Sequence, residues 1–315
     1  MKKRVLITGA NGFIGAALRK RFEEKEYIVY GVGLNAKEGI TELNLLKKAK
    51  VDSFIAEMQP DIIMHCAGSA NVTLSVQNPD LDYESNVTAT HNLLTAIHNL
   101  EKYHPRFVFL SSAGVYGNPI SLPITEDMPY NPLSPYALHK IMCEEACLFY
   151  KRNYGLDVKI ARIFSAYGPG LRKQIFWDMY QKYKNVFKLN MFGTGYESRD
   201  YIEIDDLTNA LFLLATANTE YSIFNVANGK ELSIRHVTET FASIVGLSKD
   251  VITFNGTVRE GDPINWRADI SRIEELGYKQ NINIETGLRH FVNWAESMEE
   301  FANNEYIRGT KTLQK

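Results

Sequence analysis

Hydrophobic positions follow two alternating patterns over the first half of the chain. Short, nearly continuous apolar runs are typical of strands buried on both faces of a sheet, and apolar residues three or four apart indicate helices. The predicted strands are residues 5–8, 27–32, 61–65, 106–110 and 158–163, and the predicted helices are residues 13–25, 51–58, 83–99 and 135–153. This alternation predicts an α/β fold, a doubly wound parallel sheet with helices on both faces.

The pattern becomes looser after residue 163. Loops with glycine and proline separate predicted strands at 187–192, 201–204 and 223–226 from predicted helices at 206–217, 233–246 and 284–300. We expect a large domain formed by residues 1–164 and joined by 206–227, and a smaller lobe formed by 165–205 and 228–302. Residues 303–315 are polar and lack periodicity, so we expect a loosely held tail there.

Composition excludes several classes of protein. With 315 residues, of which 45% are hydrophobic and 23% charged, the chain is typical of a soluble globular protein. A formal net charge of -2 leaves no surplus of positive charge for nucleic acid or anionic lipid. The longest apolar stretch is shorter than the roughly 20 residues of a membrane span, and the first apolar run is too short for a signal peptide. We therefore expect a cytoplasmic protein with no nucleic-acid or membrane partner.

Glycines occupy the junction between the first predicted strand and the first predicted helix, in the run Gly9-Ala10-Asn11-Gly12-Phe13-Ile14-Gly15. Glycine permits a sharp turn, close approach of backbone N–H groups to a pyrophosphate, and tight packing of the helix on the strand. The positive end of the helix then faces the anion. The run predicts a dinucleotide-binding turn, and a plain tight turn is the alternative explanation.

The end of the second predicted strand carries no carboxylate, because it reads Tyr30-Gly31-Val32-Gly33-Leu34-Asn35-Ala36-Lys37. In dinucleotide-binding folds, an acidic residue near this point usually binds the adenosine ribose. Its absence removes a charge that would repel a 2′-phosphate, and Lys37 could pair with one. The expected cofactor is therefore NAD or NADP, and a solvated loop lysine is the alternative role for Lys37.

The pattern Tyr-x-x-x-Lys occurs at Tyr136/Lys140 and again at Tyr180/Lys184. Only the first pair follows a helix-start signal, with Ser134 as the cap and a proline in the first turn. Residues four apart share a helix face, so the Lys140 ammonium can approach the Tyr136 phenol. A cation and the positive end of a helix both favour the phenolate, which makes Tyr136 a candidate proton shuttle. A solvated helix face explains the second pair better.

The predicted strand at 106–110 leads into Ser111-Ser112-Ala113-Gly114-Val115-Tyr116-Gly117. In an open parallel sheet, ligands bind beyond the carboxyl ends of the strands, so hydroxyls here face the predicted cofactor crevice. A serine at this point can bond the reacting oxygen beside Tyr136. A serine-rich turn bonded to its own backbone is the alternative.

Together, the glycine turn, the Ser-Ser-x-x-Val-Tyr-Gly strand end and the Tyr136/Lys140 pair resemble the extended short-chain dehydrogenase/reductase family, specifically its nucleotide-sugar epimerases and dehydratases. The resemblance covers residues 4–296. It implies a Rossmann-type sheet with a C-terminal substrate lobe and a homodimer. Further segments similar to family motifs are His65-Cys66-Ala67-Gly68, Asn86, Arg199-Asp200-Tyr201-Ile202, Asp205-Asp206, Arg259-Glu260-Gly261-Asp262, Asp269-Ile270-Ser271 and Leu276-Gly277-Tyr278.

The resemblance also implies roles for individual residues. Ser112, Tyr136 and Lys140 would be the catalytic triad, and Tyr136 and Lys140 would contact the cofactor together with Ala67 and Asn86. The residues implied to bind a nucleotide-diphosphate sugar are Ser112, Ser165, Tyr167, Arg199 and Arg259. An arginine fork suits the diphosphate.

Two of these substrate roles stay open. Ser165 stands where relatives often carry asparagine, which puts a phosphate contact there in doubt. A structural ion pair is the alternative role for Arg199.

Departures from the family pattern reduce the number of family reactions that this chain is expected to catalyse. Family dehydratases carry an Asp-Glu pair where this chain has Ala113 and Gly114, and the cysteine of certain 3,5-epimerising members is also absent. The resemblance therefore implies a nucleotide-diphosphate-sugar 4-epimerase that acts by transient hydride transfer to NAD(P). The alternatives are an NADPH-dependent 4-ketoreductase that makes a deoxysugar nucleotide, and a non-catalytic dinucleotide-sensing protein.

His139, Cys143 and Cys147 lie four apart along one predicted helix face, which could imitate the edge of a metal site. A fourth ligand is not apparent in the sequence. We therefore interpret the cysteines as buried reduced thiols that pack the helix, and we expect no metal.

Overall fold

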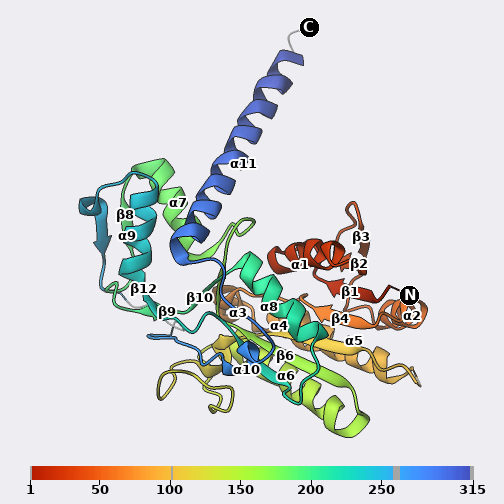
Figure 1. Cartoon of the computed structure of the whole chain (residues 1–315). Coiled ribbons are helices and arrows are strands. Elements are labelled where there is room, and N and C mark those ends of the chain that lie inside the picture. Colours follow the sequence, from red (N-terminus) through yellow and green to blue (C-terminus); the bar gives the residue numbers. More distant parts are fainter. Residues whose placement is uncertain (1, 101, 258–262, 313–315) are drawn as a thin grey trace.

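The centre of the computed structural model is a seven-stranded sheet in the order β11-β6-β5-β4-β1-β2-β3 (Figure 1). The structure describes residues 2–100, 102–257 and 263–312, and the side chains of 299–312 are not described. Every pairing in this sheet is parallel, which confirms the predicted Rossmann-type fold. The strands are β1 (Arg4–Thr8), β2 (Ile28–Gly33), β3 (Ile40–Glu42), β4 (Ile62–His65), β5 (Arg106–Ser112), β6 (Asp157–Ile163) and β11 (Ile223–Val226).

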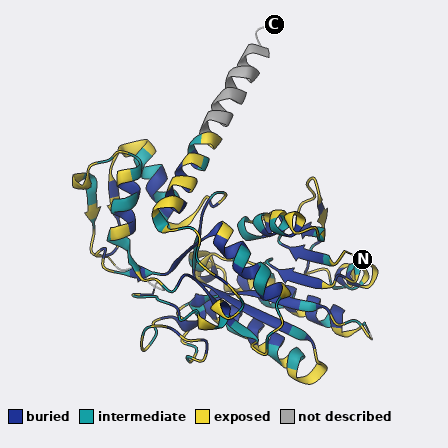
Figure 2. Cartoon of the chain, in the orientation of Figure 1, coloured by how far each residue is buried: buried dark blue, intermediate teal, exposed yellow. Residues whose placement is uncertain are grey.

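Alternate residues of each central strand enter two separate cores, one on each face of the sheet. In β5, Val108 and Leu110 pack toward one face, and Phe107 and Phe109 toward the other. Helices α1 (Phe13–Glu24) and α8 (Ile204–Thr216) cover the first face, and α2 (Lys48–Met58), α5 (Ala89–His98) and α6 (Pro135–Tyr154) cover the second. Figure 2 shows the strands as a buried layer between these helices. Burial on both faces explains why the strands read as continuous apolar runs.

Local sequence fixes where helix α6 begins and ends. The Ser134 side chain accepts a hydrogen bond from the backbone N–H of Ala137, and Pro135 occupies the first turn. At the other end, Gly155 adopts a left-handed conformation with φ of 70°, which suits glycine. These signals place Tyr136 in the first turn of α6, as the sequence predicts.

The helix predicted over 83–99 is divided in the structure. A π-helical turn, Glu84–Thr88, joins the short helix α4 (Pro79–Tyr83) to α5, and helix α3 (Val72–Gln77), which the sequence analysis did not predict, precedes them. The side chains of Asn71 and Asn78 cap α3 and α4. A π-turn is a local insertion that apolar periodicity does not reveal.

The C-terminal residues form a lobe with its own core, which includes Met179, Leu189, Phe241 and Phe291. It contains α7 (Gln174–Val186), β8 (Leu189–Met191), α9 (Ile234–Ile244), β13 (Ile252–Phe254) and the start of α11 (Ile284–Thr312). In the described residues, β8 pairs with β13 within the lobe, and two further two-stranded sheets pair β7 with β10 and β9 with β12. The remaining short elements are η2 (Ala113–Tyr116), β7 (Ser165–Tyr167), β9 (Ser198–Arg199), β10 (Tyr201–Glu203), β12 (Leu232–Ser233), η3 (Lys249–Val251) and α10 (Ser271–Glu274).

Helix α11 continues to Thr312, beyond residue 303, where we expected a tail. A polar segment without an apolar stripe can still form backbone hydrogen bonds along a helix, so the missing periodicity did not exclude one. Over the described part of the chain, the structure contains no helix that is both long and apolar enough to cross a membrane.

Candidate active site

The glycine turn lies at the carboxyl end of β1 and leads directly into α1. Gly9 has φ of +65°, and a Cβ atom on it would lie 2.8 Å from the Cα of Ala67. A Cβ atom on Gly15 would overlap the carbonyl oxygen of Gly9. Gly12 is the N-cap of α1, and neither a side-chain cap nor an acidic residue is found in its first turn. The turn therefore offers bare backbone N–H groups at a positive helix end, which fits the pyrophosphate of a dinucleotide.

A chain of buried hydrogen bonds joins the ends of β1 and β4 beside this turn. Burial lowers the pKa of His65 to about 3, so its ring is neutral. The Thr90 hydroxyl donates to the carbonyl of Asn86, and it therefore accepts from Nε2 of His65, at 3.0 Å. Nδ1 must then accept from the Thr8 hydroxyl, at 2.8 Å, and Thr8 in turn accepts the N–H of Ala67. This ordered chain fixes Ala67 at the edge of the predicted cofactor crevice.

Asn86 lies in the π-helical turn with a buried polar atom left over. Its Nδ2 donates to the carbonyl of Asp82 at 3.1 Å, whereas its Oδ1 has no hydrogen-bond partner in the described part of the chain. A Cβ atom on Gly68 would lie 2.5 Å from this Oδ1. A buried acceptor next to an exposed glycine fits a bound group that supplies a donor.

The end of β2 is shaped around Asn11. The Asn11 amide donates to the carbonyl of Asn35 at 3.0 Å, and a Cβ atom on Gly33 would lie 2.7 Å from its Nδ2. An acidic side chain at position 33 would therefore displace that amide. Lys37 is exposed in a turn whose backbone pairs with Ile40. Its side chain is free to approach a phosphate beyond the strand.

Tyr136 and Lys140 lie on the face of α6 that packs against β5. They are 8% and 6% exposed. The Lys140 ammonium donates to the carbonyl of Leu110 at 3.0 Å and lies 5.8 Å from the centre of the Tyr136 ring. The backbone N–H of Tyr136 donates to the Ser75 hydroxyl at 3.2 Å. The structure thus brings the phenol and the ammonium together at the carboxyl edge of the sheet.

Ser112 ends β5 beside this pair. Its hydroxyl oxygen accepts the N–H of Gly114 at 3.1 Å. A Cβ atom on Gly114 would lie 3.3 Å from the Ser112 oxygen and 3.9 Å from Cε1 of Tyr136. Ser112 and Tyr136 therefore flank the same bare backbone segment, where a small reacting group can meet both. The other Tyr-x-x-x-Lys pair lies in α7, where Tyr180 is buried in the lobe core.

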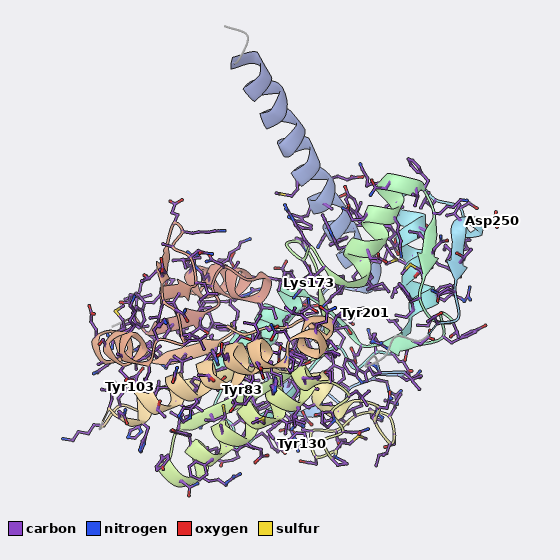
Figure 3. The ribbon with its side chains drawn as sticks, turned by 180° about the vertical axis from the view of Figure 1, so that it is seen from behind. Tyr83, Tyr103, Tyr130, Lys173, Tyr201 and Asp250 are labelled. Atoms are coloured by element: carbon purple, nitrogen blue, oxygen red, sulfur yellow. The ribbon has the colours of Figure 1, made fainter. Side chains whose placement is uncertain are left out.

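Of the residues implied on the substrate side, Ser165 and Arg199 lie at the junction of the domain and the lobe, where Figure 3 shows Tyr201 and Lys173. Ser165, half-buried, pairs with Tyr201 in the β7–β10 ladder. The Arg199 guanidinium donates to the Ser198 carbonyl at 2.8 Å and lies 5.6 Å from the Trp266 ring. Arg259 lies outside the described residues.

Tyr167 is buried in the β7–β10 ladder. It is 2% exposed, and its ring packs 5.0 Å from that of Phe176 in the lobe core. A Cβ atom on Gly287 of α11 would overlap its hydroxyl. The ring of Tyr167 therefore packs in the core of the lobe.

A buried network formed by Glu144, Arg162 and Ser111 lies next to Ser112, Tyr136 and Lys140. The sequence did not reveal this network. Arg162 is 2% exposed and Glu144 is 0% exposed, and Arg162 donates to Glu144 at 2.7 Å. Two signals were present in the sequence: an arginine inside the apolar strand 158–163, and a glutamate four residues after Lys140. Neither signal says which buried partner each residue meets.

The cysteines of α6 are packing residues. Burial raises the pKa of the Cys147 thiol well above its usual range, and that of Cys143 is raised for the same reason. His139 bonds Asp82 at 2.7 Å. Across the residues that the structure describes, no group of three or more His, Cys, Asp and Glu side chains could hold a metal ion.

Comparisons with known proteins show which family and fold this chain matches. A model of the NAD dependent epimerase/dehydratase family matches residues 5–227. The chain is 31% identical to a putative UDP-glucose 4-epimerase of Methanocaldococcus jannaschii, over 93% of this chain and 98% of the relative. It resembles the solved UDP-glucose 4-epimerase of Thermotoga maritima with UDP-glucose at 25% identity and a TM-score of 0.86, covering 94% and 99% of the two chains. RMD of Pseudomonas aeruginosa, complexed with NADPH, is similar at 25% identity and a TM-score of 0.82, covering 94% and 100%.

Proposed function

Because the chain belongs to the NAD-dependent epimerase/dehydratase family, we propose that it is a nucleotide-diphosphate-sugar 4-epimerase that uses NAD or NADP. The observation that carries the proposal is the meeting of Ser112 and Tyr136 around Gly114, with Lys140 beside the phenol. The relative from Methanocaldococcus jannaschii is described as a putative UDP-glucose 4-epimerase and the structure from Thermotoga maritima as a UDP-glucose 4-epimerase, which favours inversion at C4.

The residues divide the proton chemistry among themselves. Tyr136, as the phenolate, accepts the proton of the sugar 4-hydroxyl and later returns it. Lys140 stabilises the negative phenolate oxygen through its adjacent positive charge. Ser112 donates a hydrogen bond to the reacting oxygen. When bound, the dinucleotide supplies the reversible oxidation of the sugar carbon.

The residue types at positions 113 and 114, Ala113 and Gly114, argue against a dehydration reaction. Loss of water from the sugar needs a separate acid and base, and neither residue has an ionisable side chain. Gly114 is also closely flanked by Ser112 and Tyr136, so a larger side chain there would fill the space between them. The site therefore suits oxidation and reduction at one carbon.

One observation favours an NADPH-dependent 4-ketoreductase as the second candidate. Residues 30–37 carry no carboxylate, and the Asn11 amide occupies the space that a side chain at position 33 would need. A 2′-phosphate is not repelled there, and Lys37 is available to pair with it. RMD, one of the similar structures, is complexed with NADPH.

We further propose a homodimer formed through α4 and α6. Leu138, Met142 and Phe149 on α6 are large apolar residues that are exposed in the single chain, as are Leu81 and Tyr83 on α4. Figure 3 shows Tyr83 on the outer face of the domain. Pairing two copies over this face would remove the apolar side chains from water. Sedimentation velocity tests it, because Met142→Glu should convert the dimer to a monomer.

Mass spectrometry of the small molecules that co-purify, followed by NMR of UDP-, dTDP-, GDP- and CDP-sugars after incubation, tests the proposed function. An epimerase purifies with a dinucleotide bound and forms the C4 epimer with no added reductant. A reductase consumes NADPH in proportion to a 4-keto sugar. If the protein binds a dinucleotide but converts none of these sugars, both enzymatic proposals fail.

A further inference from the structure

We propose that Glu144, Arg162 and Ser111 form a buried clamp that holds Ser112 in register with Tyr136 and Lys140. Glu144 would act as a positioning residue, because it contacts strand β5 through Ser111 and not the reacting atoms. The kinetic part of the proposal rests on the proposed function, and the structural part does not.

The clamp begins on a single face of α6. Tyr136, Lys140 and Glu144 are four residues apart, so all three side chains point toward the end of β5. Lys140 donates to the carbonyl of Leu110, and Glu144 accepts from the hydroxyl of Ser111. Consecutive residues of β5 are thus tied to consecutive turns of α6, and Ser112 is the next residue along the strand.

Arg162 holds the Glu144 carboxylate in one orientation. Its Nε donates to both carboxylate oxygens at 3.1 Å, and its Nη2 donates to Oε2 at 2.7 Å. The Tyr130 hydroxyl adds a bond to Oε2 at 3.0 Å. Because both oxygens are bonded and fully buried, the carboxylate cannot rotate without leaving a charged group unpaired.

The other side of Arg162 connects the clamp to the rest of the sheet. Its Nη1 donates to the Tyr116 hydroxyl at 2.8 Å, and that hydroxyl donates to Oδ1 of Asn225 at 2.7 Å. Asn225 is fully buried in β11 and donates to the carbonyls of Ile124 and Asp269. Side chains from α6, β5, β6 and β11 therefore form one network. Figure 3 shows Tyr130, which bonds Glu144, beside α6.

An apolar pair of the same size could fill this space, so packing alone does not explain the charges. Apolar contacts are non-directional, whereas hydrogen bonds fix the distance and angle between a helix and a strand. Proton transfer depends on placement to within about 0.5 Å. Directional bonds are thus what the edge between Ser112 and Tyr136 requires.

The test compares Ser111→Ala and Glu144→Gln with Glu145→Gln. Ser111→Ala removes one hydroxyl, and Glu144→Gln keeps size and shape but removes the charge. Glu145 is the next residue on α6 and is exposed, and it meets the network only at its edge, through the Tyr130 hydroxyl at 3.4 Å, so it controls for loss of a carboxylate outside the buried Glu144–Arg162 pair. We expect kcat per dinucleotide-loaded chain to fall about fivefold for Ser111→Ala and at least tenfold for Glu144→Gln. The sugar KM and the dinucleotide Kd should change less than twofold, and Glu145→Gln should match the wild type.

A purely stabilising role predicts something different. It would lower the loaded fraction and leave kcat per loaded chain unchanged, which would overturn the proposal. If the clamp acts through Ser112, Ser111→Ala has no further effect on kcat in a Ser112→Ala background. Independent, multiplicative losses in the double variant would also overturn it.

A crystal structure of Glu144→Gln decides the matter even if no sugar nucleotide is turned over. The clamp predicts that the distance between the Ser112 and Tyr136 hydroxyls changes by more than about 0.5 Å. An unchanged distance would overturn the clamp without bearing on the proposed function. If the wild type converts no nucleotide sugar, the proposed function is refuted and the clamp is not.

Discussion

The turn between β1 and α1 and the edge between β5 and α6 both lie at the carboxyl end of the sheet, yet they are built in opposite ways. At the turn, Gly9 and Gly15 leave out side chains so that backbone groups can come close. At the edge, Lys140, Glu144 and Arg162 place charged side chains in the interior. The turn therefore cannot accept added atoms, and the edge cannot lose a hydrogen-bond partner.

This difference separates binding from chemistry. A dinucleotide pyrophosphate is recognised by backbone N–H groups, which every residue type supplies provided that no Cβ atom intervenes. Proton transfer depends on particular side chains at fixed positions. Substitutions at the turn should change affinity, and substitutions at the edge should change turnover.

The largest expected effect is at the edge. Lys140→Met removes the cation beside Tyr136, and we expect turnover to fall by about 10²- to 10⁴-fold, the usual contribution of a proton-transfer group. Lys184→Met changes the lysine of the other Tyr-x-x-x-Lys pattern, in α7, and should leave turnover unchanged. Steady-state assays on both variants decide the point. Equal losses in the two would mean that the placement of Lys140 carries no special role.

The next largest effect is on the free energy of unfolding, which Arg162→Met should lower strongly. It leaves the Glu144 carboxylate buried without its partner, and removal of one member of a buried pair typically costs about 3–5 kcal/mol. Glu285→Gln breaks an exposed pair with Arg289 on α11, which is worth about 0.3–0.5 kcal/mol. Urea unfolding of both variants measures the contrast. A loss below about 1 kcal/mol in Arg162→Met would contradict the buried network.

At the turn, Gly9→Ala should weaken dinucleotide binding by about 10- to 100-fold, because overpacking costs about 1–3 kcal/mol. Gly155→Ala is the matched control, since Gly155 has φ of +70° but nothing within 4 Å of a Cβ atom. Both variants carry the same left-handed strain, and only Gly9→Ala adds a clash with the backbone of Ala67. Fluorescence titration with NADH and NADPH measures both affinities. Equal affinities would show that the turn tolerates a side chain.

A pH-dependent effect concerns Glu203, which lies in neither region. Burial raises its pKa from 4.5 to about 7, and its Oε1 has no hydrogen-bond partner within the described residues. The native state keeps a proton that the unfolded state releases. This stabilisation is complete below pH 4.5 and is lost as the pH rises to about 7.

Glu203→Gln should remove that dependence, which is at most about 1.4 kcal/mol per pH unit for one group. Urea unfolding at pH 5 and pH 7.5 should therefore show a smaller decrease in the variant than in the wild type. Parallel decreases would mean that Glu203 titrates normally in the native state.

The sequence predicts the regular part of this molecule well, and physical reasons explain why. Strands such as 158–163 are buried on both faces, and α6 begins at a Ser-Pro signal, so local patterns determine both. The glycine turn is visible because every glycine there has a steric reason. Position along the chain also placed Ser112 and Tyr136 at the same sheet edge.

Contacts between distant residues are what the sequence does not reveal. Glu144 meets Ser111 across 33 positions and Arg162 across 18, and no local pattern specifies either pairing. The family resemblance implies a substrate contact for Tyr167, and the sequence does not show that its ring packs against neighbouring aromatic residues of the lobe core. The π-turn around Asn86 is likewise hidden, since it is a single rare turn inside a longer helical segment.

The central claim is that Tyr136 transfers the proton while the backbone turn holds the dinucleotide. Its most direct test is Tyr136→Phe, assayed for bound dinucleotide per chain and for conversion of the nucleotide sugar that the wild type accepts. We predict unchanged dinucleotide occupancy and turnover at least about 10³-fold lower. Conversion by Tyr136→Phe at the wild-type rate would contradict the account.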